Sequence, residues 1–500
     1  MQISPSKIPP EVVRVTEGLE KAGFEAWIVG GCVRDLLLGR MPKDWDVTTN
    51  ATPEQIQATF EHTYYTNEFG TVGVVNDPPS HEATGGHSDA DKSVRVIEVT
   101  PYRLEGKYSD TRRPDSVEFS QNIEDDLKRR DFTINALAYS ASKGQMLDLY
   151  DGIKDIGTRW IRAVGEPKER FDEDALRIMR AVRIAAELDF TIEPKTEAAI
   201  GESAAQLEKI SKERVRDEFV RILNSSQPMK ALILSHKLGI LKYIAPELEA
   251  GIGVAQNQAH SFDVFEHNIR SAQHAADKDW NFIVRLSALF HDVGKPKSQR
   301  WSDEKKDWTF HGHEVVGARM TKKILENLKF SRETIDKATS LVRWHMFFSD
   351  PAKVTLSAVR RIVANVVKEH IWDLINLRIC DRIGTGRPKE QPFRLRKYQA
   401  MIEQAMRDPI SVGMLQIDGR KIMELGEKPG PRIGWTLHAL LEEVLEDSAR
   451  NTAEYLENRA GELLQMPDKE LRTIGEEAKE AKDVAEEAEI KDIQKKYFVD

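Results

Sequence analysis

The sequence has little cysteine and no long apolar run, and both shortages narrow the class of protein. Only two cysteines, Cys32 and Cys380, occur among 500 residues, which excludes a disulfide-stabilised secreted scaffold. A membrane-spanning helix would need about eighteen consecutive apolar residues, and no such run is present. The first residues also lack the charged-then-apolar layout of a signal peptide. We therefore expect a cytoplasmic protein with no membrane partner.

Positive charge is also in deficit, because 73 lysines and arginines face 82 acidic residues and leave a formal net charge of −9. A chain that is basic throughout is thereby excluded. Nucleic-acid binding is not, since it requires only a local positive groove. A chain of 500 residues is too long for one hydrophobic core, so we expect about two to four domains.

What the sequence does contain is a phosphate-binding pattern near its start. The apolar run 27–29 predicts a short buried strand, and Gly30 and Gly31 end it. Residues 32–38 then predict a helix, with Arg34 in its first turn. A strand, a glycine turn and a helix N-terminus favour a bound anion, because free N–H groups and the helix dipole both point toward it. The guanidinium of Arg34 would add a fixed positive fork.

A pair of aspartates follows this pattern. Asp44 and Asp46 flank Trp45 at the start of a strand predicted over 45–48, and alternation along a strand places both carboxylates on one face. Two like charges side by side are costly unless a cation lies between them, and oxygen ligands suit Mg²⁺. The glycine pair or the aspartate pair alone is also typical of a turn or a solvated loop. In this order they predict a metal-dependent nucleotidyl-transfer centre.

A third carboxylate lies on a later strand. Residues 71–76 predict one strand, and residues 93–102 predict the strand that returns after it. Glu98 lies in the middle of this second strand. Glu98 is either a third acidic group of the centre or an edge-strand glutamate in water. The polar segment 77–92 predicts a flexible loop between the two strands, and 104–114 is expected to be mobile.

Two arginines begin the next candidate element, a helix predicted over 125–139. Arg129 and Arg130 cannot both face the core, so at least one should be free to bind an anion. Asp131 and Asn135 are four residues apart, which would place them on one face of that helix.

A further helix is predicted over 171–188, and it carries a regular row of charges. Asp174, Arg177 and Arg180 are three residues apart and would lie on one face, with Arg183 continuing the row. The row is either an ion-pair ladder on a solvated face or a set of hydrogen-bonding groups for a ligand.

At this point the sequence resembles a known family. The segments GGCVRDLLLG, DWD, IEVTPYR, RRDFTINALAY, FDEDALRIMRAVRIAAELDF and ISKERV are similar to those of the bacterial and eukaryotic class of tRNA nucleotidyltransferases and poly(A) polymerases. The resemblance implies an α+β fold, in which a small mixed-sheet head precedes helical neck, body and tail regions. The implied boundaries are 1–152 for the head, 153–250 for the neck, 251–385 for the body, 386–465 for the tail and 466–500 for a charged extension.

The resemblance also implies a reaction, the addition of C, C and A to tRNA 3′ ends from CTP and ATP. Asp44 and Asp46 would bind Mg²⁺, with Glu98 and Arg130 as further catalytic groups. The implied nucleotide-binding residues are Gly30, Gly31, Arg34, Arg129, Arg130, Asp174, Arg177, Arg180 and Arg183.

Base choice has a chemical reason in this scheme. Cytosine and adenine each present an amino donor beside a ring-nitrogen acceptor. The Asp174 carboxylate could accept from the first and the Arg177 guanidinium could donate to the second, whereas guanine and uracil would fail both contacts.

A set of histidines marks the second half. His267, His291, Asp292, His313, His345 and Asp381 follow the order of an HD phosphohydrolase domain, and His311 is a rival for the position of His313. Imidazoles suit transition metals such as Ni, Mn or Fe, and an aspartate can bridge two ions. The alternative is a relic that packs without metal.

Three other functions compete with CCA addition. The enzyme could add only A, or be a poly(A) polymerase. It could also be chiefly an HD phosphohydrolase that acts on tRNA ends. A CC-only enzyme is disfavoured because 102–114 fills the place of a loop that such enzymes lack.

The basic stretch 378–397 could contact tRNA or be a solvated linker. The chain is expected to be a monomer or a homodimer.

Overall fold

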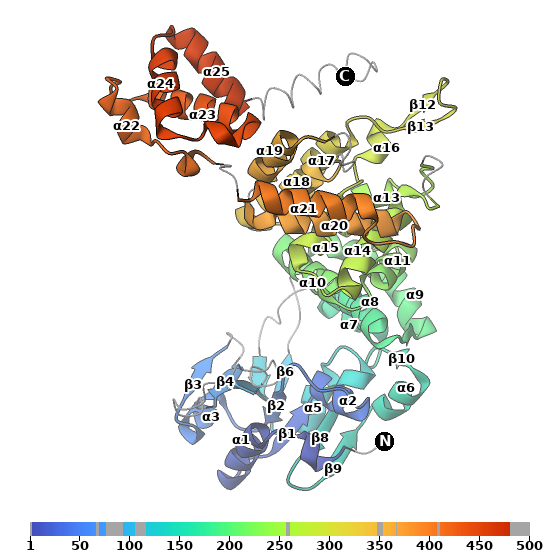
Figure 1. Cartoon of the computed structure of the whole chain (residues 1–500). Helices are drawn as coiled ribbons and strands as arrows, with labels where there is room; N and C mark the ends of the chain where they lie inside the picture. Colours follow the sequence, from blue (N-terminus) through green and yellow to red (C-terminus); the bar gives the residue numbers. More distant parts are fainter. Residues whose placement is uncertain are drawn as a thin grey trace. The chain divides into compact units, whose positions relative to one another are not determined.

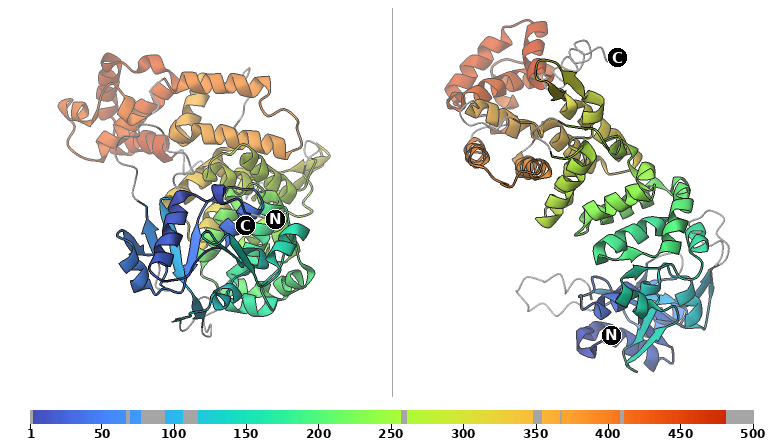
Figure 2. Two further views of the ribbon diagram at one scale, coloured as in Figure 1. Left: turned by 90° about the horizontal axis from the view of Figure 1, so that it is seen from below. Right: turned by 90° about the vertical axis from the view of Figure 1, so that its right-hand side faces the viewer.

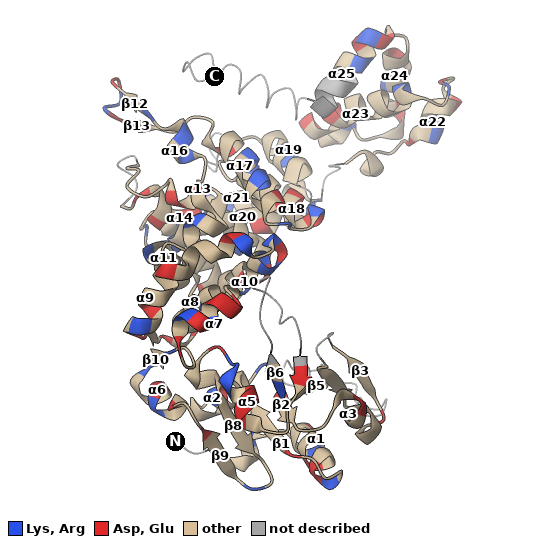
Figure 3. Ribbon diagram, turned by 180° about the vertical axis from the view of Figure 1, so that it is seen from behind, with Lys and Arg blue, Asp and Glu red and all other residues tan. Residues whose placement is uncertain are grey.

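The computed structural model describes residues 3–66, 70–76, 94–105, 117–256, 261–347, 354–366, 368–407 and 411–480. The chain divides into two compact units, one of Met1–Ile222 with Lys230–Ile244 and one of Leu223–Met229 with Ala245–Asp500. Figures 1 and 2 show their elements coloured along the sequence. Charged residues of both signs are spread over both units (Figure 3). Within the described part of the chain, no helix combines the length and apolarity needed to cross a membrane.

A seven-stranded mixed sheet forms the head in the first unit (Figure 1). Its strand order is β3-β4-β5-β2-β1-β8-β9, and β2 and β5 run parallel while the other neighbours are antiparallel. The strands are β1 (Ala26–Val29), β2 (Asp46–Thr49), β3 (Thr63–Tyr65), β4 (Val72–Val75), β5 (Val96–Pro101), β8 (Leu137–Ser140) and β9 (Gln145–Asp148). The predicted α+β class with a mixed-sheet head is confirmed. All of the loop predicted over 77–92 and most of the segment 104–114 lie outside the described residues.

Short helices connect these strands. They are η1 (Pro5–Lys7), α1 (Pro10–Lys21), α2 (Gly31–Leu37), α3 (Pro53–Thr59), α5 (Ile123–Lys128) and α6 (Gly152–Thr158), with a separate hairpin of β6 (Arg103–Glu105) and β7 (Val117–Phe119). Helix α3 begins with a capping box, in which Thr52 and Gln55 satisfy each other's backbone N–H groups. Helix α1 buries Val12, Val15 and Leu19, one apolar face of an amphipathic helix.

The single helix predicted over 125–139 is wrong. Helix α5 ends at Lys128, a 3-10 turn η2 (Thr133–Asn135) follows, and the apolar residues then form β8. Strand β8 pairs with β1, where Tyr139 lies opposite Ile28. A short apolar run does not distinguish a buried strand from a buried helix by its period, and here the unpaired edge of β1 decides.

The helix predicted over 171–188 is also wrong in one respect, because it is broken at Asp174. Helix α7 (Pro167–Glu173) ends there and α8 (Leu176–Leu188) begins two residues later. Asp174 has an extended backbone, with φ −146° and ψ 101°, and its Oδ1 accepts the N–H of Leu176 at 3.0 Å. Its carboxylate therefore lies at a helix junction and not in a continuous row with Arg177 and Arg180.

Helices complete the first unit and lead into the second. They are α9 (Pro194–Ser203), η3 (Ala204–Lys209), α10 (Lys212–Asn224), α11 (Pro228–Lys237) and α12 (Leu241–Ile244), beside the parallel pair β10 (Trp160–Ile161) and β11 (Thr191–Ile192).

The second unit contains a helical body and a tail. The body comprises α13 (Pro246–Glu249), α14 (Val264–Asp277), α15 (Phe282–Phe290), α16 (Lys295–Ser298), the hairpin β12 (Arg300–Ser302) and β13 (Asp307–Thr309), α17 (His313–Asn327), α18 (Arg332–Trp344), α19 (Leu356–Val366), η4 (Lys368–His370), α20 (Ile371–Gly384) and α21 (Phe393–Ala405). The tail comprises η5 (Val412–Met414), α22 (Gly419–Glu424), α23 (Pro431–Glu446), η6 (Ser448–Arg450), α24 (Ala453–Leu464) and α25 (Asp468–Glu480) around its own apolar core.

Two glycines set how closely the body helices approach one another. At Gly384 of α20 a Cβ atom would lie 2.2 Å from Ser271 Oγ on α14. At Gly294, before α16, it would lie 2.3 Å from the His313 carbonyl oxygen of α17. Only glycine fits at such distances. Helix α20 is therefore packed closely against α14, and the segment that precedes α16 is packed closely against the start of α17.

Candidate active sites

The acidic cluster of the head is built on its parallel strand pair. The register places Asp46 of β2 beside Glu98 of β5, and Asp44 precedes β2 as an exposed residue. Burial, with the nearby carboxylates of Glu98 and Asp44, raises the pKa of Asp46 to about 6 against the opposing effect of Arg130. Strand β5 lies between β4 and β2, so Glu98 is not on an edge strand. Oxygen ligands that repel one another in this way fit a hard divalent cation.

The glycine turn lies against this cluster. Gly30 has φ +84°, and a Cβ there would be 3.0 Å from Arg130 Nη1 and 3.4 Å from Asp46 Oδ2. Trp45, between the two aspartates, is only 2% exposed and anchors the strand in the core. The turn, Arg130 and the carboxylates are therefore immediate neighbours.

Arg129 and Arg130 share one buried carboxylate, that of Asp126. Arg130 Nη2 lies 2.9 Å from Asp126 Oδ2 and Arg129 Nε lies 3.0 Å from Asp126 Oδ1. Burial alone would raise the pKa of Asp126, but the two guanidinium groups lower it. Both arginines therefore have an acidic partner, although each guanidinium retains further N–H donors for an anion. Both still line a cavity of about 200 Å³, together with Val29, Asp46, Val47, Thr71, Thr100 and Arg103.

A chain of hydrogen bonds joins the helix after the glycine turn to α8. Arg34 Nη1 donates to Asn135 Oδ1 at 2.7 Å, Asn135 Nδ2 donates to Asp131 Oδ1 at 3.1 Å, and Arg180 Nε donates to Asp131 Oδ2 at 2.9 Å. Although burial opposes it, Arg180 and Asn135 hold the pKa of Asp131 well below its usual range. The prediction that Asp131 and Asn135 lie on one helix face is therefore wrong, because Asp131 lies between α5 and η2, although the two side chains are hydrogen-bonded.

The two residues expected to read the base are each held by other groups. Asp174 Oδ2 lies 2.7 Å from Arg214 Nη2 of α10. Arg177 Nη1 donates to Glu173 Oε2 at 2.6 Å, and its Nη2 donates to the Arg129 carbonyl oxygen at 2.8 Å. Both side chains are therefore fixed in place before any ligand binds, and a carboxylate or guanidinium retains further hydrogen-bonding capacity.

Arg183, also on α8, is held by two glutamates. Its Nη1 lies 2.9 Å from Glu187 Oε2, and its Nε bonds to the buried Glu218 of α10. Arg214 and Glu218 were missed by sequence reasoning. Both lie 35 to 40 residues from their partners, and no local period could pair them.

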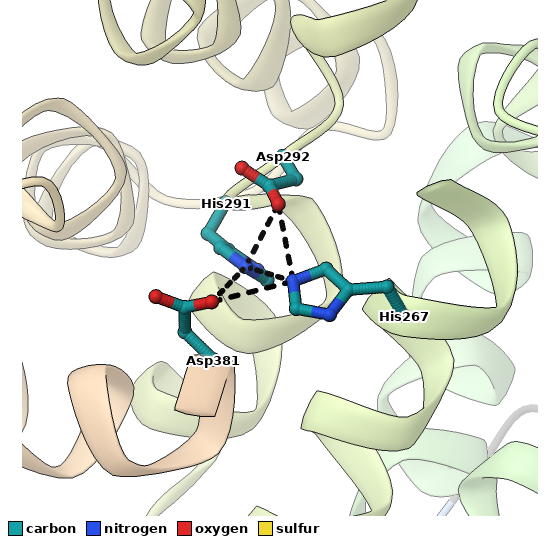
Figure 4. A group of neighbouring side chains, drawn as sticks. All are labelled: His267, His291, Asp292 and Asp381. Carbon is teal, nitrogen blue, oxygen red and sulfur yellow. Dashed lines mark hydrogen bonds and ion pairs between the residues drawn. The ribbon is translucent and has the colours of Figure 1, made fainter. Parts of the chain in front are cut away.

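The second candidate site is a cluster of imidazoles and carboxylates in the body (Figure 4). His267 comes from α14, His291 and Asp292 from the end of α15, and Asp381 from α20. His267 Nε2 lies 2.9 Å from His291 Nε2, 3.1 Å from Asp292 Oδ2 and 3.4 Å from Asp381 Oδ1. Each offers one ligand atom within 4.8 Å of the others.

A second group shares Asp292 with the first. His313 Nε2 and His345 Nε2 lie 3.2 Å and 3.5 Å from Asp292 Oδ1, whereas the first group faces Oδ2. Asp292 therefore has one oxygen directed at each group, which is the arrangement of a bridging carboxylate. His311 lines the neighbouring cavity but is not a member of either group, so the structure favours His313.

The hydrogen bonds of the imidazoles fit bound cations. Nδ1 of His291, His313 and His345 each lies 2.7 to 2.8 Å from a backbone carbonyl oxygen. A carbonyl only accepts, so each Nδ1 carries a proton, and a ring that is otherwise neutral presents its lone pair at Nε2. Two such lone pairs face each other across 3.3 Å between His313 and His345. Ring nitrogens and carboxylates that converge in this way favour a positive charge among them, which a metal ion can supply.

The carboxylates of the cluster likewise favour positive charge at the His291 ring. Burial alone would lower the pKa of His291, yet Asp292 and Asp381 raise it to about 9. Lys295 Nζ lies 2.6 Å from Asp292 Oδ2, and Arg378 bonds to Asp381. Lys295 and Arg378 were not predicted as site residues. Lys295 lies three residues after Asp292 and could have been found from that spacing.

Comparisons with known families and proteins match both sites. Residues 26–162 match the family described as "Poly A polymerase head domain", 189–252 match "Probable RNA and SrmB- binding site of polymerase A", and 264–383 match "HD domain". The family comparison therefore covers the acidic cluster and the histidine cluster separately.

Two curated relatives and one solved structure extend the likeness. The CCA-adding enzyme of Lactococcus lactis subsp. lactis is 48% identical over 247 residues, which are 49% of this chain and 58% of that protein. The CCA-adding enzyme of Lactobacillus helveticus is 32% identical over 469 residues, which are 92% of this chain and 100% of that protein. The crystal structure of the Bacillus stearothermophilus CCA-adding enzyme in complex with CTP is 27% identical, with a TM-score of 0.66, and covers 93% of this chain and 100% of that one.

The likeness to the Lactobacillus protein extends over nearly the whole of this chain and the full length of that protein. The chain therefore belongs to the CCA-adding enzyme family of nucleotidyltransferases.

Proposed function

We propose that this enzyme adds C, C and A to the 3′ end of tRNA from CTP and ATP and releases pyrophosphate. The observation that carries the proposal is the placement of Asp46 beside Glu98, next to an arginine-lined cavity and the glycine turn. The relatives named for CCA addition, one of them solved with CTP, support the choice of substrates. We also propose that the enzyme acts in the cytoplasm.

In this reaction the terminal 3′-hydroxyl oxygen attacks the α-phosphorus of the nucleotide, and the bond to the β-phosphate breaks. Asp44 and Asp46 would hold Mg²⁺, which supplies charge neutralisation and acidifies the attacking hydroxyl. Glu98 adds a third carboxylate beside them. Arg129 and Arg130 line the cavity where the triphosphate would bind, and Arg34 is positioned by Asn135. The rate comes from positioning and charge stabilisation, because no covalent enzyme intermediate is needed.

Base choice would rest on Asp174 and Arg177. The carboxylate would accept from the amino group of C or A, and the guanidinium would donate to the adjacent ring nitrogen. Arg214 holds the Asp174 carboxylate at 2.7 Å and thereby acts as a positioning residue. A wrong base would leave these groups unpaired, which discriminates more strongly than an apolar pocket.

Replacing Asp174 or Arg177 by alanine is therefore expected to relax base choice. Each loss leaves one base contact unmade, so the preference for CTP and ATP over UTP and GTP should fall by roughly ten- to a hundredfold. The measurement is kcat/KM for each nucleoside triphosphate with tRNA that lacks its terminal nucleotides.

Asp172→Ala is the matched control, because this exposed aspartate lies two residues away and bonds to Gln206. If both Asp174→Ala and Arg177→Ala keep the full preference for CTP and ATP, the two residues form only structural ion pairs and the base is read elsewhere.

Addition of A alone and poly(A) synthesis are less favoured, because the relatives matched here are CCA-adding enzymes. An HD phosphohydrolase is likewise less favoured as the chain's main activity, since the acidic cluster of the head is intact.

The histidine cluster supports a second, hydrolytic activity in the same chain. Ni, Mn or Fe ions would be held by His267, His291, Asp292, His313, His345 and Asp381 and would supply Lewis acidity. The substrate would be a terminal phosphate or a 2′,3′-cyclic phosphate at a damaged tRNA end. A water oxygen bonds to phosphorus, one phosphorus–oxygen bond breaks, and the proton passes to the leaving alkoxide. The product with a free 3′-hydroxyl is the substrate that the head requires.

A further inference from the structure

A cavity of about 660 Å³ lies beside the histidine cluster, and its walls are basic. Asp292, His313 and Asp381 of the cluster line one part of it. Its cationic lining residues are Lys295, Lys305, Arg378, Arg382, Arg387 and Arg394, against a single further carboxylate, Asp307. Two of the cations, Lys295 and Arg378, bind the carboxylates of the cluster. The remaining excess of positive charge favours an anionic ligand next to the metal ligands.

One wall of this cavity is aromatic and comes from the β12–β13 hairpin (Figure 1). Trp308 lines the cavity. Trp301 lies directly opposite it in the antiparallel register, so both rings stand on one face of the hairpin. Their centroids are 5.3 Å apart at an interplanar angle of 79°. Trp301 is 52% exposed and does not line the cavity. The aromatic surface thus continues from the inside of the cavity to the solvent.

We propose that this hairpin is a base-stacking platform for the single-stranded 3′ end of an RNA. The last base stacks on Trp308, and the preceding base stacks on Trp301 at a steep angle to it, because the two rings are nearly perpendicular. Lys305 and Arg382 bind the phosphates. Aromatic rings beside cations are the combination that binds single-stranded nucleic acid, because every base has a face to stack. A mononucleotide would use Trp308 alone and leave the exposed ring of Trp301 without a role.

This inference rests on the proposed hydrolytic function for the identity of the reacting group, and it adds which residues select an RNA end over other phosphate esters. The test compares three substrates of the metal-loaded protein. They are an RNA oligonucleotide ending in a 2′,3′-cyclic phosphate, the corresponding mononucleotide, and the same ribose cyclic phosphate without a base.

Trp308→Ala is expected to lower kcat/KM about tenfold or more for the oligonucleotide and the mononucleotide, the loss of one base–aromatic stack, and to leave the base-free ester unchanged. Trp301→Ala should lower it only for the oligonucleotide. Trp308→Phe should retain most of the activity. Trp372→Ala is the control, because this tryptophan is also partly exposed in the second unit but does not line the cavity.

An equal loss on the base-free ester would overturn the proposal, because Trp308 would then act on the cluster and not on a base. Undiminished hydrolysis of the oligonucleotide by both alanine variants would overturn it as well.

A binding measurement separates this inference from the hydrolytic function. Calorimetric binding of a short 3′-phosphorylated oligonucleotide, without added metal, should weaken about tenfold in Trp308→Ala and Trp301→Ala relative to Trp372→Ala. If that holds while the wild type hydrolyses none of the three substrates, the platform stands and the hydrolytic assignment fails. If hydrolysis occurs but binding is equal in all variants, the platform fails.

Discussion

Alanine at Asp46 or at Asp44 is expected to slow nucleotide addition at least about a thousandfold, which corresponds to roughly 4 kcal/mol of transition-state stabilisation. Asp46 lies beside Glu98 in the sheet, and its pKa is raised to about 6 by burial and by the neighbouring carboxylates. Removing one carboxylate weakens the site that would hold Mg²⁺ and the charge stabilisation it supplies. The measurement is single-turnover addition of labelled CTP to tRNA.

Binding of tRNA should survive both substitutions, because the phosphate contacts that dominate RNA affinity come from cations. Glu61→Ala is the control, since Glu61 is an exposed acid in the head outside the cluster. Addition at near wild-type rates in both aspartate variants would mean that the reaction takes place elsewhere in the chain.

Asp292→Ala is expected to empty the metal centre of the body and abolish hydrolysis, while nucleotide addition continues. The wild type should bind two transition-metal ions, because two groups of ligands share this aspartate. His345→Ala should remove one ion, since His345 belongs only to the second group, and His291→Ala should weaken the other. The measurement is metal content per chain after reconstitution with Ni, Mn or Fe and dialysis, together with release of phosphate from a 3′-phosphorylated RNA.

His370→Ala is the control, because His370 lies outside both groups and pairs with Asp373. If the wild type retains no metal after reconstitution and hydrolyses none of the substrates, the helical body has only a structural role. A variant Asp292→Ala that keeps two ions would show that this aspartate is not a bridging ligand.

Local sequence features predicted the core of the head site well. The apolar run before Gly30 and the helix after it are present as β1 and α2, with boundaries shifted by about one residue. This worked because a glycine pair that ends a strand has a direct backbone consequence, and Gly30 does adopt φ +84°. The spacing of Asp44 and Asp46 around a buried tryptophan is likewise a local property.

Where the sequence failed, a distant partner decided the structure. Residues 137–140 became a strand because β1 had an edge to pair with. At the helix break, the Asp174 carboxylate forms an ion pair with Arg214, which is 40 residues away in the sequence. Period and propensity carry no information about such partners. Sequence order suggested the histidine set, but the close helix approaches at Gly294 and Gly384 that bring its members together could not be inferred.

The products of the reaction show most directly whether the enzyme adds CCA. Purified enzyme is incubated with Mg²⁺, all four nucleoside triphosphates at equal concentration, and a tRNA that ends before its terminal CCA, and the 3′ ends are sequenced. We expect tRNAs extended by C, C and A and then no further. Tails of A alone, longer tails or tails of mixed sequence would contradict CCA addition. So would tRNA that stays unextended in a preparation that still hydrolyses phosphate esters.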